Sequence, residues 1–99
     1  MSITSVQRKH LRSLAHHLDP VVIIGKQGAG DTLIQAVNDA LDAHELIKVR
    51  FNDFKKDKER LLETIVGRTR CEIAGTVGHV AILFRRHEDP EQRKIELPD

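Results

Sequence analysis

Aromatic residues are scarce in this chain, whose 99 residues include three phenylalanines and neither tyrosine nor tryptophan. Domains that stack nucleotide bases on an aromatic sheet surface need such side chains, so the composition argues against that class. Cys71 has no second cysteine with which to pair. This excludes an internal disulfide and is consistent with a reducing compartment.

Long apolar runs are also missing. Residues 1–10 contain no apolar segment of the kind found in secretory signals, and no later run approaches membrane-spanning length. We therefore expect a cytoplasmic protein that does not bind membranes. Hydrophobic residues make up 39% of the chain and charged residues 31%. This balance predicts one globular domain over residues 1–99, with a polar tail from about residue 87.

The net charge of +1 conceals an uneven distribution. Residues 1–30 carry four cationic side chains and one acidic side chain, which gives this part of the chain a local charge of +3. The cations are Arg8, Lys9, Arg12 and Lys26. A positive field at one end of the chain is compatible with nucleic acid as a partner, although total charge alone does not assign one.

The first helix is predicted from a capping pattern. Thr4 and Gln7 have the spacing of a capping box, so we expect a helix to begin there. An apolar face at helical spacing is formed by Leu11, Leu14, Ala15 and Leu18. A second, basic face is formed by Lys9, Arg12 and His16. We expect the helix to end at Asp19, because the residue before Pro20 is disfavoured in helical conformation.

A strand and a second helix flank the glycine-rich stretch at 25–30. Residues 21–24, VVII, are all β-branched and predict a strand that is buried on both faces. Asp31 is expected to cap the second helix, which closes at His44. The apolar face of this helix is formed by Leu33, Ile34, Val37 and Leu41.

The second half of the chain predicts three more strands and one helix. Within 44–51, Val49 and Phe51 alternate with Lys48 and Arg50, which predicts a half-exposed strand with both cations outward. A third helix, capped by Asp53 or Asp57, has an apolar face of Leu61, Leu62, Ile65 and Val66. Two strands at 72–77 and 80–85 are joined by a short turn.

The resulting order is α-β-α-β-α-β-β, which predicts an α/β fold with a mixed four-stranded sheet and helices packed against it. A strand–helix–strand unit requires a right-handed crossover, so the first two strands should be parallel. The last two strands are joined by a hairpin and should be antiparallel.

The glycine-rich stretch GKQGAG suggests an anion site, because such turns expose backbone N–H groups at a helix N-terminus. It does not match a P-loop, in which the lysine follows the last glycine and a hydroxyl residue comes next. It also reverses the spacing of the dinucleotide fingerprint. The stretch therefore matches neither nucleotide-binding motif, and we expect no cofactor.

A G-x-x-G pattern remains, formed by Gly25, Lys26, Gln27 and Gly28. In RNA-binding modules of the KH type, a GXXG loop clamps the backbone of a few nucleotides. The glycines allow close approach, the N–H groups donate hydrogen bonds and Lys26 supplies charge. The alternative is a tight turn that uses glycine for its geometry alone, and the motif leaves both interpretations open.

No other pattern indicates reaction chemistry. The six histidines lack the paired spacing of zinc ligands, and Cys71 has no partner, so we expect no metal site. The acidic residues lie at expected helix starts and on exposed helix faces, without a nucleophile and base. We therefore expect no catalytic residues.

Several separate motifs resemble the CRM domain, a family named for chloroplast RNA splicing and ribosome maturation. They are LAHHLDPVVIIGKQG at 14–28, HELIKVR at 44–50, and ILFRR with RKIELP between 82 and 98. The chain is most similar to the stand-alone bacterial, YhbY-type RNA-binding members. The resemblance implies a fold similar to the C-terminal domain of translation initiation factor three. It also implies RNA binding in association with precursors of the large ribosomal subunit.

The resemblance also assigns candidate residues by position. The family's GxxG loop falls on residues 25–28, and its basic surface falls on the first helix, at Arg8, Lys9 and Arg12. Lys48 and Arg50 are further candidates if their strand face is open. We assign no contact to His79 or Phe84, where the family usually has a basic residue and a tyrosine, and the stretch 67–75 matches poorly.

These observations together favour a non-enzymatic RNA-binding protein of ribosome assembly, whose partner is ribosomal RNA in large-subunit precursors. The second hypothesis is a protein-interaction module that contacts ribosomal proteins or another assembly factor through its acidic helix faces. An enzyme is the third.

Overall fold

The computed structural model describes residues 3–25, 28–52 and 57–99. In this part of the chain, three helices and four strands follow one another in the predicted order α-β-α-β-α-β-β, which is confirmed. They are α1 (Ser5–Ala15), β1 (Val22–Ile24), α2 (Asp31–His44), β2 (Leu46–Phe51), α3 (Lys58–Thr69), β3 (Glu72–Val77) and β4 (Val80–Phe84). A short 3-10 helix, η1 (Pro90–Gln92), lies in the C-terminal tail.

The four strands form one mixed sheet in the order β1-β2-β4-β3. β1 is parallel to β2, and β3 is antiparallel to β4, as predicted. The expectation that VVII is buried on both faces is wrong, because β1 lies at an edge of the sheet and packs on one face only. Val22 and Ile24 are buried, whereas Ile23 points the other way and is 57% exposed.

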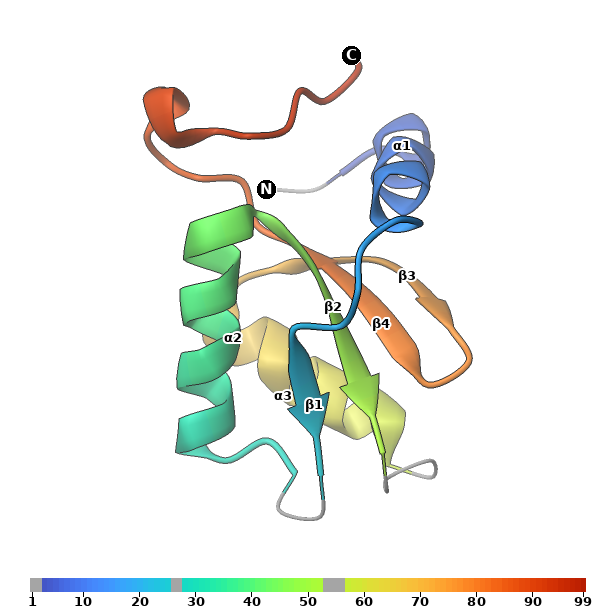
Figure 1. Ribbon diagram of the computed structural model, residues 1–99, viewed down its shortest axis with the longest axis vertical. Helices are drawn as coiled ribbons and strands as arrows, with labels where there is room; N and C mark the ends of the chain where they lie inside the picture. The colour runs from blue at the N-terminus through green and yellow to red at the C-terminus, as the bar shows by residue number, and fades with distance from the viewer. Residues whose placement is uncertain (1–2, 26–27, 53–56) are drawn as a thin grey trace.

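The two faces of the sheet are covered unequally. One face packs against α2 and α3, and its core includes Ile24, Val49 and Phe51. The opposite face packs against α1 and the tail, through a smaller cluster that includes Leu11 and Phe84. Figure 1 shows α1 beside the upper part of the sheet, with α2 and α3 to the left of and behind the strands.

The helix boundaries follow local hydrogen bonding. The predicted capping box is present, because Thr4 and Gln7 each accept the other's backbone N–H. α1 ends at Ala15 and not at Asp19, since the N–H of His16 turns back to the carbonyl of Ser13 and closes the helix early. Leu18, expected on the apolar face, consequently lies beyond the helix.

The predicted cap of α2 is also wrong. Gly30 occupies the N-cap position, and Asp31 is the first helical residue. The Asp31 carboxylate points across to α3, where it pairs with Arg68 at 2.9 Å. Asp57 is the N-cap of α3 but makes no capping hydrogen bond through its side chain, and Asp53 lies outside the described residues.

Glu45 joins α2, β2 and the tail. It has a positive φ of 63°, which L-residues rarely adopt, and at this residue α2 ends and the chain turns directly into β2. Its side chain is almost completely buried, at 1% exposure. One carboxylate oxygen accepts the N–H of His87 at 2.7 Å, and the other accepts those of Lys94 and Ile95 at 2.5 and 3.1 Å. The carboxylate therefore fixes the tail against the sheet.

Replacing Glu45 with Gln should loosen the tail. The amide keeps one acceptor oxygen, so at least one of the three partly buried N–H groups loses its partner, which should lower the free energy of unfolding by about 2 kcal/mol. Hydrogen exchange at the Lys94 and Ile95 amides should accelerate. Glu88→Gln removes the same charge from an exposed position and is the control. Unchanged exchange in Glu45→Gln would contradict this role.

The glycine turn after β1 gives a second test of the fold. The N–H of Gly28 donates to the carbonyl of Gly25 at 3.1 Å, and Gly28 has a positive φ of 66°. A Cβ at Gly28 would also meet Leu61 at 3.4 Å, whereas one at Gly25 would meet open space. Gly28→Ala should therefore lower the free energy of unfolding by about 1 kcal/mol. Gly25→Ala should change it little, and equal urea midpoints for both variants would contradict the assignment.

Candidate nucleic-acid interface

The glycine turn lies at one end of the sheet. Gly25 directly follows β1, which runs downward in Figure 1, and the Gly25–Gly28 hydrogen bond closes the turn before α2. Lys26 and Gln27, the two residues predicted to contact RNA inside this turn, lie outside the described residues. The part of the candidate interface that the structure describes therefore consists of the residues around them.

Lys48 and Arg50 lie on the outward face of β2, the strand next to β1. Val49 and Phe51 are buried, Arg50 is exposed and Lys48 is partly exposed, which confirms the predicted alternation. Arg50 pairs in register with Ile23, two residues before Gly25. The parallel pairing of β1 and β2 thus places Arg50 near the glycine turn, whereas Lys48 lies farther from it, opposite Val21.

Arg12 lies on the same face of the sheet and crosses from α1 to β3. Its side chain packs so closely over Gly75 that a Cβ at Gly75 would lie 2.6 Å from the Arg12 Cδ. A shift in the β3–β4 register between Ile73 and Gly75 marks this point. The stretch 67–75, which matches the family motifs poorly, therefore contains Gly75, the residue against which the candidate Arg12 packs. No sequence motif indicated this contact, because it depends on how α1 crosses β3.

Arg12, Lys48 and Arg50 form a group of positive charges on one face of the sheet. Gly75, beneath Arg12, pairs with Ile82, and Ile82 pairs with Lys48 on the next strand. Neighbouring strands are about 4.8 Å apart, so the Arg12 and Lys48 positions are roughly 10 Å apart across the sheet. Arg50 follows two residues along the same strand and the same face. We call these three residues the sheet cations.

The remaining α1 cations are not brought to the glycine turn. α1 lies at the upper right of Figure 1, whereas Gly25 follows the lower end of β1, so the two are separated along the long axis of the molecule. Lys9 is exposed. Arg8 is partly buried, and its Nε has no hydrogen-bond partner among the described residues. Arg8 and Lys9 form a second basic area on α1.

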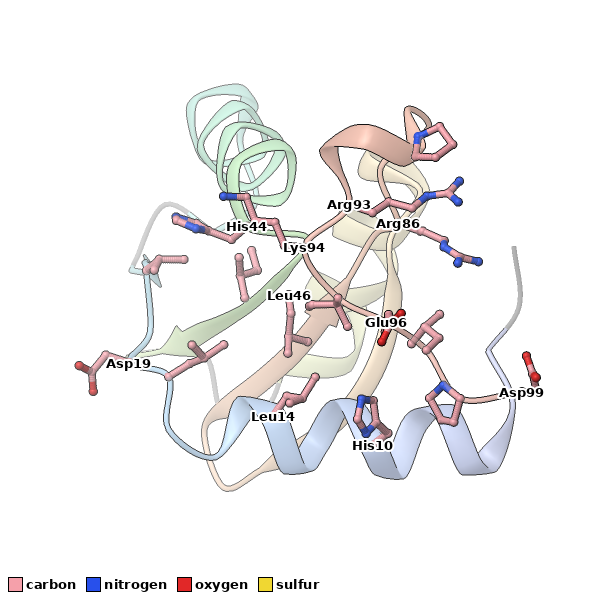
Figure 2. A pocket seen from close by; sticks show the side chains of 17 residues that line it. His10, Leu14, Asp19, His44, Leu46, Arg86, Arg93, Lys94, Glu96 and Asp99 are labelled. Carbon is pink, nitrogen blue, oxygen red and sulfur yellow. The ribbon is translucent and has the colours of Figure 1, made fainter.

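A groove of 1420 Å³ lies between α1, the start of β2 and the tail. Figure 2 shows His10 and Leu14 projecting into it from α1, with His44 and Lys94 on the opposite side. The charged residues that line it are mixed in sign: Arg86, Arg93 and Lys94, together with Asp19, Glu96 and Asp99. A mixed lining does not favour a polyanion in particular, which distinguishes this groove from the sheet cations.

Arg85 and Cys71 both have structural surroundings that account for them. Arg85 donates to the Asn38 side chain at 2.7 Å and the Thr69 carbonyl at 2.6 Å, and pairs with Asp42 at 2.8 Å, so it ties α2 to α3. Cys71 is buried, and this burial raises the pKa of its thiol, which keeps it protonated and unreactive.

The described residues contain no group of three or more His, Cys, Asp and Glu side chains placed to hold a metal ion. No helix within residues 3–25, 28–52 and 57–99 has both the length and the apolar character needed to cross a membrane.

Comparison with known proteins identifies the family. The CRS1/YhbY (CRM) domain model matches residues 3–85. The "Probable RNA-binding protein YqeI" of Bacillus subtilis is 38% identical, over 97% of this chain and 99% of its own length. An "RNA-binding protein" of Haemophilus influenzae is 35% identical, over 98% of this chain and 96% of its own length.

A solved structure agrees in both fold and sequence. The solution structure of a hypothetical protein from Staphylococcus aureus, described as a candidate RNA-binding protein, superposes with a TM-score of 0.80. It is 36% identical and the match covers 98% of this chain and 100% of that one. The compact α/β arrangement is therefore shared with that structure. The chain belongs to the CRS1/YhbY (CRM) domain family.

Proposed function

We propose that this protein binds RNA through the glycine turn and the sheet cations, with residues 1–99 acting as one RNA-binding domain. The observation that carries the proposal is the register of β1 and β2, which sets Arg50 opposite Ile23 and so beside Gly25. A backbone that approaches the glycines would meet positive charge on the adjacent strand. The names of the relatives support RNA as the ligand.

Within this interface the residues have separate roles. Gly25 and Gly28 let the sugar–phosphate backbone approach the turn closely, and Lys26 and Gln27 between them supply charge and a hydrogen-bonding amide. Lys48, Arg50 and Arg12 continue the positive track across the sheet. Arg8 and Lys9 make a second, more distant contact with a longer RNA.

We further propose that the RNA is ribosomal RNA in precursors of the large subunit, and that the protein assists their assembly without catalysing a reaction. The proposal rests on the resemblance to stand-alone bacterial members of the family. Mapping crosslinks from the protein to RNA in cellular ribosomal particles tests it directly. Crosslinks to large-subunit precursors are expected, and crosslinks confined to other RNAs, or nucleotide turnover by the protein, would contradict it.

A protein partner is the second candidate, and the groove beside α1 is the observation that favours it. Leu14, Leu18 and Val21 leave apolar surface accessible there, and charges of both signs surround it. The acidic faces expected to serve such a partner are partly engaged, because Asp31 and Asp42 pair with arginines of the same chain. Salt-tolerant binding to an assembly factor or a ribosomal protein in the absence of RNA would favour this candidate.

Salt dependence tests the sheet cations. With four phosphate contacts, from Arg12, Lys26, Lys48 and Arg50, log affinity for single-stranded RNA should fall against log salt with a slope of about −3. Lys48→Gln with Arg50→Gln should make that slope shallower by about 1.4, since each contact contributes about 0.7. Titrations at several salt concentrations measure it.

Arg60→Gln with Arg70→Gln is the matched control for this test. It removes the same charge from two exposed residues at α3 and its C-cap, on the helix that covers the other face of the sheet. The control should retain the slope of the unchanged protein. Equal slopes in all three proteins would mean that Lys48 and Arg50 are ordinary solvated surface.

The glycine turn is tested by Lys26→Asp with Gln27→Asp. Both glycines are retained, so the free energy of unfolding should stay within about 0.5 kcal/mol of the unchanged protein. Two added negative charges should repel phosphate, so RNA affinity and co-sedimentation with large-subunit precursors should fall sharply. If the folded variant binds and sediments like the unchanged protein, the turn is purely structural.

A further inference from the structure

The uncovered end of the sheet presents one row of side chains across all four strands. The register pairs Ile23 of β1 with Arg50 of β2, Arg50 with Val80 of β4, and Val80 with Val77 of β3. Paired residues in a sheet point to the same face. This is the face that α1 covers farther along, where Ile82 and Phe84 are buried. We call Ile23, Arg50, Val80 and Val77 the open row.

The apolar members of the open row are accessible to solvent. Ile23 is 57% exposed and Val77 is 69% exposed, and Val80 between them is partly exposed. Val21, the neighbour of Ile23 on the same face, is 52% exposed. Exposed aliphatic side chains that are gathered on one surface are characteristic of a binding site, whereas isolated ones are not.

The charges in and beside the open row indicate what kind of partner fits this surface. Arg50 lies within the open row, and Lys48 and Arg12 lie in the row behind it, over Ile82 and Gly75. Neither row contains an acidic side chain. A partner that fits must carry negative charges at regular intervals and must also offer flat apolar faces. A single-stranded nucleic acid has both properties.

We propose that the open row binds unpaired RNA bases, whose faces lie on Ile23, Val80 and Val77 while the sheet cations hold the phosphates. The inference rests on the proposed RNA-binding function and deepens it by naming the RNA as single-stranded. Bases in a duplex are stacked on one another and their faces are closed to protein, whereas unpaired bases can be spread over a surface. Aliphatic side chains here take the place of exposed aromatic residues, because Phe51 and Phe84, two of the three phenylalanines, are buried.

The geometry places the bases and the backbone on adjacent surfaces. Ile23 is followed by Ile24 and then by Gly25, the first residue of the glycine turn. An RNA strand whose phosphates lie at the glycine turn and on Arg50 would therefore turn its bases toward the open row. This arrangement predicts that replacing the aliphatic residues lowers the affinity for single-stranded RNA without changing its salt dependence.

Three probes separate base contacts from phosphate contacts. They are a single-stranded RNA of about 12 nucleotides, within the range that small single-strand-binding domains cover, the same strand in a perfect duplex, and an abasic strand with the same number of phosphates. Ile23→Thr with Val77→Thr keeps β-branched side chains at both positions and replaces the ethyl group of Ile23 and one methyl group of Val77 with hydroxyls. Val6→Thr, at an equally exposed valine on α1, is the control.

The unchanged protein should bind the single strand most tightly. Ile23→Thr with Val77→Thr should weaken that binding about fivefold with the same salt slope, because apolar contact is lost and no phosphate contact is removed. Binding of the abasic strand should not change in this variant. Val6→Thr should match the unchanged protein with every probe, and melting temperatures should confirm that all variants are folded.

Three outcomes would overturn the inference. One is equal affinity of the folded variant and the unchanged protein for the single strand, and another is equal affinity of the unchanged protein for the base-bearing and abasic strands. In either case the proposed function stands, because RNA is still bound. The third is dimerisation in sedimentation experiments that the double variant abolishes, which would assign the open row to a second copy. Absence of all RNA binding would instead overturn the proposed function together with this inference.

Discussion

The buried carboxylate of Glu45 connects parts of the chain that are far apart in sequence. Its own N–H closes α2 on Leu41, and its carbonyl accepts the N–H of Arg85 at the end of β4. Its side chain accepts three N–H groups of the tail. A charged group is tolerated at this depth because every oxygen has a donor. Through these bonds one residue aligns α2 with the sheet and holds the tail, and Ile95 and Leu97 of the tail pack on the α1 side of the core.

Unequal coverage of the sheet creates the candidate interface. α2 and α3 together fill one face, whereas α1 spans only part of the other and leaves Ile23 and Val77 open. A second consequence is the position of Arg12, which reaches the sheet because Gly75 has no side chain beneath it. Arg50 and the exposed Ile23 lie next to the end of β1, where the glycine turn begins, whereas α1 lies beside the opposite part of the sheet (Figure 1).

Local patterns predicted most of the elements. The capping box, the apolar face of α2 and the alternation in β2 depend on contacts between residues a few positions apart, and these are present. On α1 only Leu11 and Ala15 of the predicted apolar face are buried. The errors involve position within the fold. Four β-branched residues predicted a strand buried on both faces, but β1 is an edge strand, and a run of apolar residues does not encode the number of its neighbours. Asp31 had the chemistry of a cap, yet Arg68 from α3 takes its carboxylate.

The sequence by itself determined the order of the elements, the glycine turn, the outward direction of Lys48 and Arg50, and the resemblance that the family match then established. Only the tertiary structure decided which cations lie together. Lys48 and Arg50 meet the end of β1 through strand pairing, and Arg12 reaches the same face by crossing β3. Helical and strand periodicities specify which side of an element a residue occupies. Which elements become neighbours depends on the packing of the whole core, and this packing left one end of the sheet uncovered.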